Sequence, residues 1–237
     1  MDDNKKKFTH FKIHTQYSIC EGAIKISDLA KFCKEKKINA IGLSDSFNLC
    51  GALEFSEEIS KVKTQPIIGS QINFKFNDLI GKIPIFAKTE KGFKNLTKLS
   101  SKSFLDVEAS QAPHCNIDDL IENSEDLIIT SGGLDSLFYQ LIKKNNPKQL
   151  QQFSSKIKSV FGNRFYLEIQ RHNDYDEKRI ENSLLELSEK IKIPLIASQE
   201  IFYIEQDMFE AHDALLCIGQ KTYVDEEKRK NTVISII

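Results

Sequence analysis

The sequence predicts an α/β barrel. Short apolar runs alternate with longer amphipathic stretches along most of the chain, and most of the apolar runs end in polar residues. Strands that alternate with helices usually pair in parallel through right-handed crossovers. A length of 237 residues is ordinary for a single barrel, and it buries enough surface to hold a core without a metal or a disulfide. The polar residues at the strand ends favour a closed barrel over an open sheet.

Seven apolar runs are predicted to form the strands. They cover residues 10–14, 40–43, 66–74, 83–87, 127–130, 164–170 and 194–197. In an α/β barrel, binding and catalytic residues lie at the C-terminal ends of the strands. That rule directs attention to residues in or after the C-terminal parts of the predicted strands: His14, Asp45, Gln71, Gly133, Glu168, His172 and Glu200.

Helical spacing of apolar residues predicts the segments between the strands. The predicted helices cover residues 26–36, 52–62, 92–104, 134–144, 147–160, 177–192 and 208–218. Ser27 is a candidate cap for the first helix, because a serine hydroxyl can accept a hydrogen bond from a free backbone N–H. Residues 100–116 are the best candidate for a long surface loop.

The composition excludes several classes of protein. The 33 basic and 34 acidic residues nearly cancel, unlike those of a free-standing cationic protein that grips nucleic acid by neutralising phosphates. The five cysteines are scattered and form no C-x-x-C pair, which indicates reduced thiols. No N-terminal apolar run suggests a signal peptide, and no stretch approaches the roughly 20 apolar residues of a membrane helix. We expect a cytoplasmic protein without a membrane partner.

An ordered series of short segments carries a resemblance to a known family. The segments are residues 14–18, 21–22, 44–51, 66–69, 92–96, 165–172 and 213–221. From about Phe8 to Asp225 the chain resembles the N-terminal PHP (polymerase and histidinol phosphatase) domain of bacterial DNA polymerase III alpha subunits. The resemblance implies a distorted TIM-like barrel of about seven strands with surrounding helices. It also implies a PHP domain at residues 8–225, a disordered N-terminus at 1–7 and an atypical tail at 226–237. The tail looks like the product of a truncation or a frameshift.

Active members of this family bind divalent metals through His, Asp, Glu and one Cys at the strand ends. Phosphoester hydrolysis benefits from a metal that generates hydroxide and neutralises phosphate charge. The resemblance places nine residues of this chain at ligand positions: Lys12, His14, Glu21, Ser46, Gln71, Lys82, Gly133, Glu200 and Phe202. His14, Glu21 and Glu200 retain side chains that can bind a metal, and the other six do not.

Two of the six replacements are lysines, Lys12 and Lys82. A fixed ammonium charge repels a divalent cation, and this repulsion is poorly screened in a partly desolvated barrel mouth. The two lysines could instead form ion pairs with Glu21 and Glu200. We therefore expect no catalytic residue, no cofactor and no multinuclear metal site in this segment. If a single metal binds, its ligands would be His14, Glu21 and Glu200.

The resemblance implies a structural and docking role. The expected partners are the proofreading exonuclease subunit and other replicase subunits, with DNA bound through domains downstream of this segment. The parent would be a DNA-directed DNA polymerase, a nucleotidyltransferase that uses Mg, whose acidic catalytic residues lie in a palm domain beyond this chain. One alternative is an active metal-dependent PHP phosphoesterase or exonuclease, which would use His14, Asp45, Glu168, His172 and Glu200. A small-molecule phosphatase of the histidinol-phosphate type is less favoured, because residues 48–51 and 213–221 look more like the polymerase branch.

Overall fold

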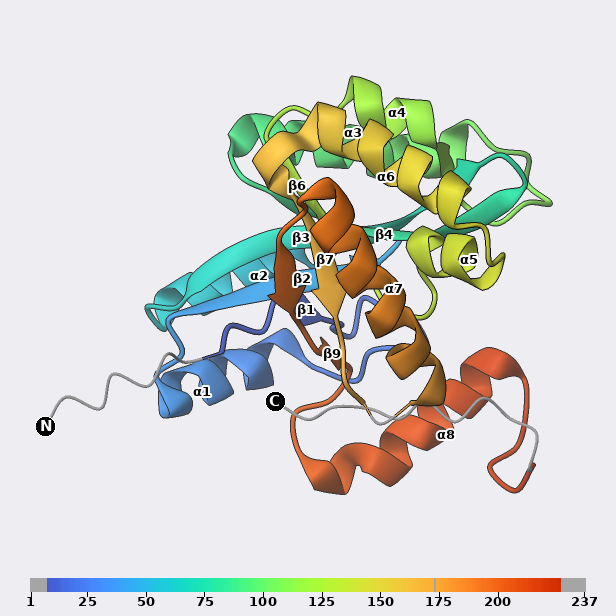
Figure 1. The fold of residues 1–237 in the computed structure, drawn as a ribbon. Coiled ribbons are helices and arrows are strands. Elements are labelled where there is room, and N and C mark those ends of the chain that lie inside the picture. Colours follow the sequence, from blue (N-terminus) through green and yellow to red (C-terminus); the bar gives the residue numbers. More distant parts are fainter. Residues whose placement is uncertain (1–7, 173, 227–237) are drawn as a thin grey trace, which may run out of the picture.

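The chain folds into one curled sheet with helices packed against it, as a computed structural model shows (Figure 1). The structure describes residues 8–172 and 174–226. The segment expected to be disordered, 1–7, lies outside the described residues, as do residues 227–237 of the atypical tail. Within the described part of the chain, no helix has the length and apolar character needed to cross a lipid bilayer.

The strands form a single mixed sheet. Its order is β8-β7-β6-β4-β3-β2-β1-β9, and β5 pairs with β3. The strands are β1 (Lys12–Ile13), β2 (Ala40–Ser46), β3 (Gln65–Phe76), β4 (Leu79–Ala87), β5 (Cys115–Asn116), β6 (Leu127–Thr130), β7 (Phe165–Ile169), β8 (Leu195–Ala197) and β9 (Glu200–Ile201). Each of the seven predicted runs contains a strand, and β5 and β9 are additional strands of two residues each. The predicted α/β class and barrel-like curvature are confirmed.

The pairing around β4 differs from the parallel arrangement that the sequence suggested. β4 is antiparallel to both β3 and β6, whereas β1-β2-β3 and β6-β7-β8 are parallel. Only Asn77 and Asp78 separate β3 from β4, and Asn77 has a positive φ of 56°. A two-residue connection makes a hairpin, because a parallel crossover needs about a dozen residues or more.

The two edges of the sheet belong to strands that follow each other in the chain. β8 ends at Ala197 and β9 begins at Glu200, although the two strands stand at opposite ends of the strand order. Three residue steps span at most about 11 Å, so the sheet must curl until its edges approach one another. Among the described residues, no ladder joins β8 to β9. The sheet is therefore a half-barrel in its hydrogen bonding, and the predicted closed barrel is wrong. The sheet is open along a gap between β8 and β9 that we call the seam.

Helices cover the sheet (Figure 1). They are α1 (Ile26–Lys36), α2 (Ala52–Lys61), α3 (Glu90–Leu105), α4 (Ile117–Glu122), α5 (Leu137–Lys143), α6 (Pro147–Phe161), α7 (Tyr175–Ile191) and α8 (Phe209–Gln220). The predicted cap at Ser27 is wrong, because Ser27 lies inside α1 and Lys25 occupies the N-cap position. The predicted loop at 100–116 is too long: α3 extends to Leu105, and β5 begins at Cys115.

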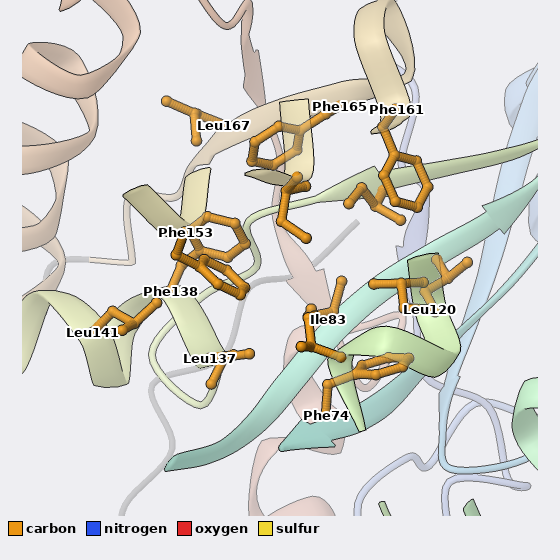
Figure 2. Close-up of a cluster of buried hydrophobic side chains, with 14 of the residues drawn as sticks. Phe74, Ile83, Leu120, Leu137, Phe138, Leu141, Phe153, Phe161, Phe165 and Leu167 are labelled. Carbon is orange, nitrogen blue, oxygen red and sulfur yellow. The ribbon is translucent and has the colours of Figure 1, made fainter. Parts of the chain in front are cut away.

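The apolar core consists of two clusters. The larger one lies between β3, β4, β6 and β7 and the helices α3 to α7, and Figure 2 shows its aromatic side chains meeting. There Phe138 lies with its ring centroid 5.2 Å from that of Phe153 and 5.4 Å from that of Phe165. The smaller cluster joins β1, β2 and β9 to α1 and α2. Leu49 packs against both clusters.

Candidate functional site

Eight of the nine positions singled out in the sequence meet in one polar network. The network lies at the ends of β1 and β2, beside the middle of β3 and β4, and includes β9 and the loop that follows β1. Direct contacts of 4.3 Å or less connect Lys12, His14, Glu21, Ser46, Gln71, Lys82, Glu200 and Phe202. We call these eight residues the polar centre. Gly133 lies beside it and contributes no side chain.

Lys12 lies at the bottom of the polar centre and is fully buried. Its Nζ is 3.0 Å from Oε1 of Glu168 and 3.4 Å from Oε2 of Glu200. Burial by itself lowers the pKa of Lys12, but the charges of Glu168, Glu200 and Asp135 outweigh burial and raise that pKa above its ordinary value. The ammonium group is therefore charged at neutral pH, and it stands between two carboxylates.

Lys82 is the second buried cation and comes from β4. Its Nζ lies 2.8 Å from Oδ2 of Asp135 and 3.6 Å from Oε1 of Glu21, and it donates to Oγ of Ser46 at 3.0 Å. The same ammonium group lies 5.3 Å from the ring centroid of Phe47. Burial opposes the charge, but Asp135 and Glu21 outweigh burial and raise the pKa of Lys82. The expected ion pairs of the two lysines with Glu21 and Glu200 are thus both present.

His14 forms the middle of the polar centre. Its Nδ1 lies 3.0 Å from Oγ of Ser18, and its Nε2 lies 2.8 Å from Oε1 of Glu200. Phe202 stacks on the imidazole at a centroid distance of 4.3 Å and an interplanar angle of 16°. Gln71 donates from Nε2 to Oε1 of Glu200 at 2.5 Å. Both nitrogens of the imidazole and one of its faces are therefore occupied by protein groups.

Glu200 is the carboxylate that the polar centre shares. Burial raises its pKa, but the charge of Lys12, the hydrogen bond and charge of His14 and the charge of Lys82 hold that pKa well below its usual range. The carboxylate is therefore ionised at neutral pH. Cations that belong to the protein supply the compensation that a buried carboxylate requires.

Asp45 lies next to the polar centre at the end of β2 and is fully buried. It accepts hydrogen bonds from the backbone N–H of Thr15 at 2.6 Å, from Oγ1 of Thr15 at 2.8 Å and from Oγ of Ser18 at 2.8 Å. Burial raises the pKa of Asp45, and the hydrogen bonds from Thr15 and Ser18 oppose that shift. Asp45 thus fixes the loop that carries Ser18, and its oxygens already have protein donors.

Glu168 is an essential member of the network that the set of nine positions does not include. It is 2% exposed and pairs with Lys12. Its Oε2 accepts from Oγ1 of Thr130 at 2.5 Å, and its Oε1 accepts from Nε2 of Gln170 at 2.6 Å and from Oγ of Ser198. The position of Glu168 after a predicted strand was a sequence signal for it. No sequence signal predicted that Glu168 would pair with Lys12, whose strand β1 lies near the opposite edge of the sheet.

Gly133 stands where the family resemblance expects a cysteine, and the space for a side chain is already filled. A Cβ atom added to Gly133 would lie 2.3 Å from Oε1 of Gln170. The Gln170 amide holds Glu168 through its Nε2. The neighbouring Gly132 has a positive φ of 75°, which glycine adopts without strain.

The remaining histidines make structural contacts. His172 bonds to Glu177 through Nδ1 at 2.5 Å and through its backbone N–H at 2.6 Å, so it forms a pair separate from the polar centre. His212 of α8 is fully buried and donates from Nε2 to the carbonyl oxygen of Glu21 at 2.6 Å. His114 is 7% exposed, and its Nδ1 lies 2.8 Å from the carbonyl oxygen of Ala112.

The residues of the polar centre do not fit a metal ion. Glu200 lies against Nε2 of His14, whereas Glu21 lies 3.8 Å from Nδ1 on the other side of the ring. One ion therefore cannot use a single imidazole nitrogen together with both carboxylates. The ammonium groups of Lys12 and Lys82 stand among the carboxylates and would repel a divalent cation. Across residues 8–172 and 174–226, no group of three or more His, Cys, Asp or Glu side chains is arranged to hold a metal.

Comparison with known families agrees with the resemblance found in the sequence. The PHP domain family matches residues 10–172, and the chain belongs to this family. Among curated proteins, the chain is 35% identical to DNA polymerase III subunit alpha of Rickettsia conorii over 227 residues, which are 94% of this chain and 19% of that protein. It is 35% identical to the same subunit of Borreliella burgdorferi and 32% identical to that of Caulobacter vibrioides. These matches cover 95% and 97% of this chain and 20% and 21% of those proteins. The chain thus spans about a fifth of the length of these relatives.

Solved structures share the fold at low sequence identity. An amidohydrolase from Chromobacterium violaceum superposes with a TM-score of 0.54 and 8% identity, covering 87% of this chain and 96% of that one. A protein of Bifidobacterium adolescentis, described as a metal-dependent phosphoesterase, superposes with a TM-score of 0.53 and 12% identity. That match covers 81% of this chain and 86% of the other. These similarities establish the architecture alone.

Proposed function

We propose that this chain is a metal-free PHP module of a bacterial replicative DNA polymerase alpha subunit, acting as a structural and docking domain. The observation that carries the proposal is the placement of the Lys12 and Lys82 ammonium groups among the carboxylates of the polar centre. These cations provide the positive charge that a metal would supply in an active phosphoesterase. They cannot deliver a metal-bound hydroxide.

Burial of the polar centre also opposes a hydrolytic role. Lys12 and His14 have no exposed surface, and Gln71 is 1% exposed. The side chain of Glu200 is 14% exposed and that of Lys82 is 12% exposed. A phosphoester substrate needs access to the reacting groups, whereas here protein atoms surround them. This arrangement supports a structural role for the groups that an active PHP enzyme would use in catalysis.

The partner we propose is the proofreading exonuclease subunit of the same replicase. This proposal is supported by the similarity to polymerase III alpha subunits over nearly the whole chain. Nucleotidyl transfer with Mg, and most of the contact with DNA, would then belong to the four fifths of the parent protein that this chain does not match. The module itself would contribute binding surface, with an apolar centre and a polar rim.

The docking proposal is tested by mixing the 237-residue chain with the proofreading exonuclease of the same bacterium. The two proteins should elute together in size-exclusion chromatography at about 10 μM, where a transient interface of ordinary strength is populated. An exonuclease of unrelated fold serves as the control and should elute separately. Separate elution of the cognate pair, confirmed by the absence of a calorimetric binding signal, would remove the docking role.

The alternative of an active phosphoesterase is tested on the same preparation. Protein purified without chelator is assayed for bound transition metal and for hydrolysis of a phosphodiester in the presence of Mn²⁺. The proposal expects no stoichiometric metal and no activity that depends on His14. About one metal or more per chain, together with activity that is lost in His14→Ala, would establish the alternative.

A further inference from the structure

Backbone hydrogen bonding does not hold the two edges of the sheet together along the seam. The strand order begins with β8 and ends with β9, and no ladder joins these two strands among the described residues. The chain crosses the seam through Ser198 and Gln199, the only two residues between the strands. Something other than strand pairing must keep the two edges in register.

The apolar core does not provide that connection as one continuous body. The strand β7, next to one edge, packs into the larger cluster through Phe165 and Leu167. The strands β1 and β9 at the other edge pack into the smaller cluster through Ile13 and Ile201. The side chains that meet between the two edges are instead polar.

Lys12 is the residue whose side chain connects the two edges of the seam. It belongs to β1 and stands in register with Glu200 of β9, while its Nζ lies 3.0 Å from Glu168 of β7. The pair thus joins the second strand from one edge to the second strand from the other edge. Both side chains of the Lys12–Glu168 pair are fully buried, so water screens their attraction little.

The two carboxylates that contact Lys12 also accept hydrogen bonds from other protein groups. Glu168 accepts from Thr130 of β6 and from Gln170, and it accepts from Ser198 within the two-residue connection itself. Glu200 on the near side bonds to His14 and Gln71. Movement of either edge would separate a buried ammonium from a buried carboxylate, which is costly because neither charge has water as a substitute partner.

We infer that the buried Lys12 ammonium holds the two edges of the seam together. Its ion pair with Glu168 joins β1 to β7, and its ion pair with Glu200 joins β1 to β9. Lys82 differs in geometry. Its nearest carboxylate, Asp135, follows the strand β6 that is directly paired with β4. Lys82 therefore provides a control, a second lysine whose side chain is only 12% exposed and whose shortest ion pair does not cross the seam.

The experiment compares Lys12→Met and Lys82→Met in the 237-residue chain, using thermal unfolding and strand-resolved hydrogen exchange. Lys12→Met should lower Tm by about 10 °C, because it leaves buried carboxylates without their cation. Exchange should accelerate selectively in β1, β7, β8 and β9, while the β3–β4 hairpin keeps its protection. Lys82→Met should leave the exchange of β7, β8 and β9 unchanged.

A double variant distinguishes the loss of the Lys12–Glu168 ion pair from the general effect of leaving a buried charge without a partner. Lys12→Met combined with Glu168→Met replaces the pair by apolar side chains and should recover more than half of the lost Tm. If Lys12→Met does not fold, Glu168→Gln serves instead, and it should produce the same strand-selective exchange. A Tm within 2 °C of the parent in Lys12→Met overturns the inference. So does exchange that rises equally in the β3–β4 hairpin and at the seam in whichever single variant folds.

Discussion

The large apolar cluster and the polar centre stabilise the same sheet in different ways. In the cluster around Phe138, Phe153 and Phe165, many weak contacts add up, and any side chain of suitable volume contributes (Figure 2). In the polar centre, each charge depends on a particular partner at a particular distance, such as the 3.4 Å between Nζ of Lys12 and Oε2 of Glu200. In the apolar cluster, the loss of folding free energy should grow with the side-chain volume that is removed. In the polar centre, the loss of a single partner already leaves a charge without compensation.

The largest effect is expected from truncation in the apolar cluster. Phe153 is 1% exposed and contacts Phe76 and Phe138 at centroid distances of 4.7 Å and 5.2 Å. Phe153→Ala should lower the free energy of unfolding by about 4 kcal/mol, through lost burial and a residual cavity. Chemical denaturation measures this loss. Phe104→Ala is the control, since Phe104 is 52% exposed and should cost less than about 1 kcal/mol. Equal losses for the two variants would contradict the assignment of the core.

A slightly smaller effect, but one that depends on pH, is expected at Glu200. Glu200→Gln should cost about 3 kcal/mol at pH 7, because the buried Lys12 ammonium loses a counter-charge. The folded-state pKa of Glu200 lies below its ordinary value of 4.5, so its stabilisation is complete above that value and is lost as pH falls through the lower, folded-state pKa. Stability measured from pH 7 downward should therefore fall less steeply in Glu200→Gln than in the parent. Parallel pH profiles would show that the charge of Glu200 is not the stabilising feature.

Gly133 tests how closely the surroundings of Glu168, next to the polar centre, are packed. Gly133→Ala places a Cβ where Oε1 of Gln170 lies, so Gln170 must move away from Glu168. We expect a loss of about 1–2 kcal/mol, the range of a hydrogen bond to a charged group. The same change in a Gln170→Ala background should cost less, since the clash is gone. An identical cost in both backgrounds would mean that the strain comes from the backbone.

The smallest effect is expected for a pair outside both regions. Lys94 lies 2.7 Å from Glu90 on the exposed face of α3, and both side chains are more than 70% exposed. Lys94→Ala should change the free energy of unfolding by about 0.5 kcal/mol or less, because water and salt already screen the pair. A double-mutant cycle with Glu90→Ala measures the coupling directly. A coupling as large as that of a buried pair would remove the distinction between exposed and buried charges.

The sequence predicted the apolar framework more fully than the polar contacts. The bounds of α1 agree with the predicted 26–36, and all seven predicted runs contain strands. The ion pairs of Lys12 with Glu200 and of Lys82 with Glu21 were expected and are present. The stronger contacts with Glu168 and Asp135 were not expected. They join residues more than 50 positions apart, and local sequence patterns do not report such pairings.

The direction of β4 was also missed, for a related reason. Periodicity shows that a segment is a strand but not which way its neighbour runs. The two-residue turn at Asn77 and Asp78 held that information, because it is too short for a crossover. The short loop between these two apolar runs could therefore have predicted that β3 and β4 form an antiparallel hairpin.

The sequence by itself determined the strands, the helices and the residue types at the strand ends, because periodicity and residue chemistry act over short distances along the chain. It also indicated that two ammonium groups would stand where an active PHP enzyme needs metal ligands. Only the tertiary structure decided which carboxylates those ammonium groups meet and that the sheet stays open along one seam. Both outcomes depend on how far the sheet curls, and curvature brings together side chains that the chain itself keeps far apart.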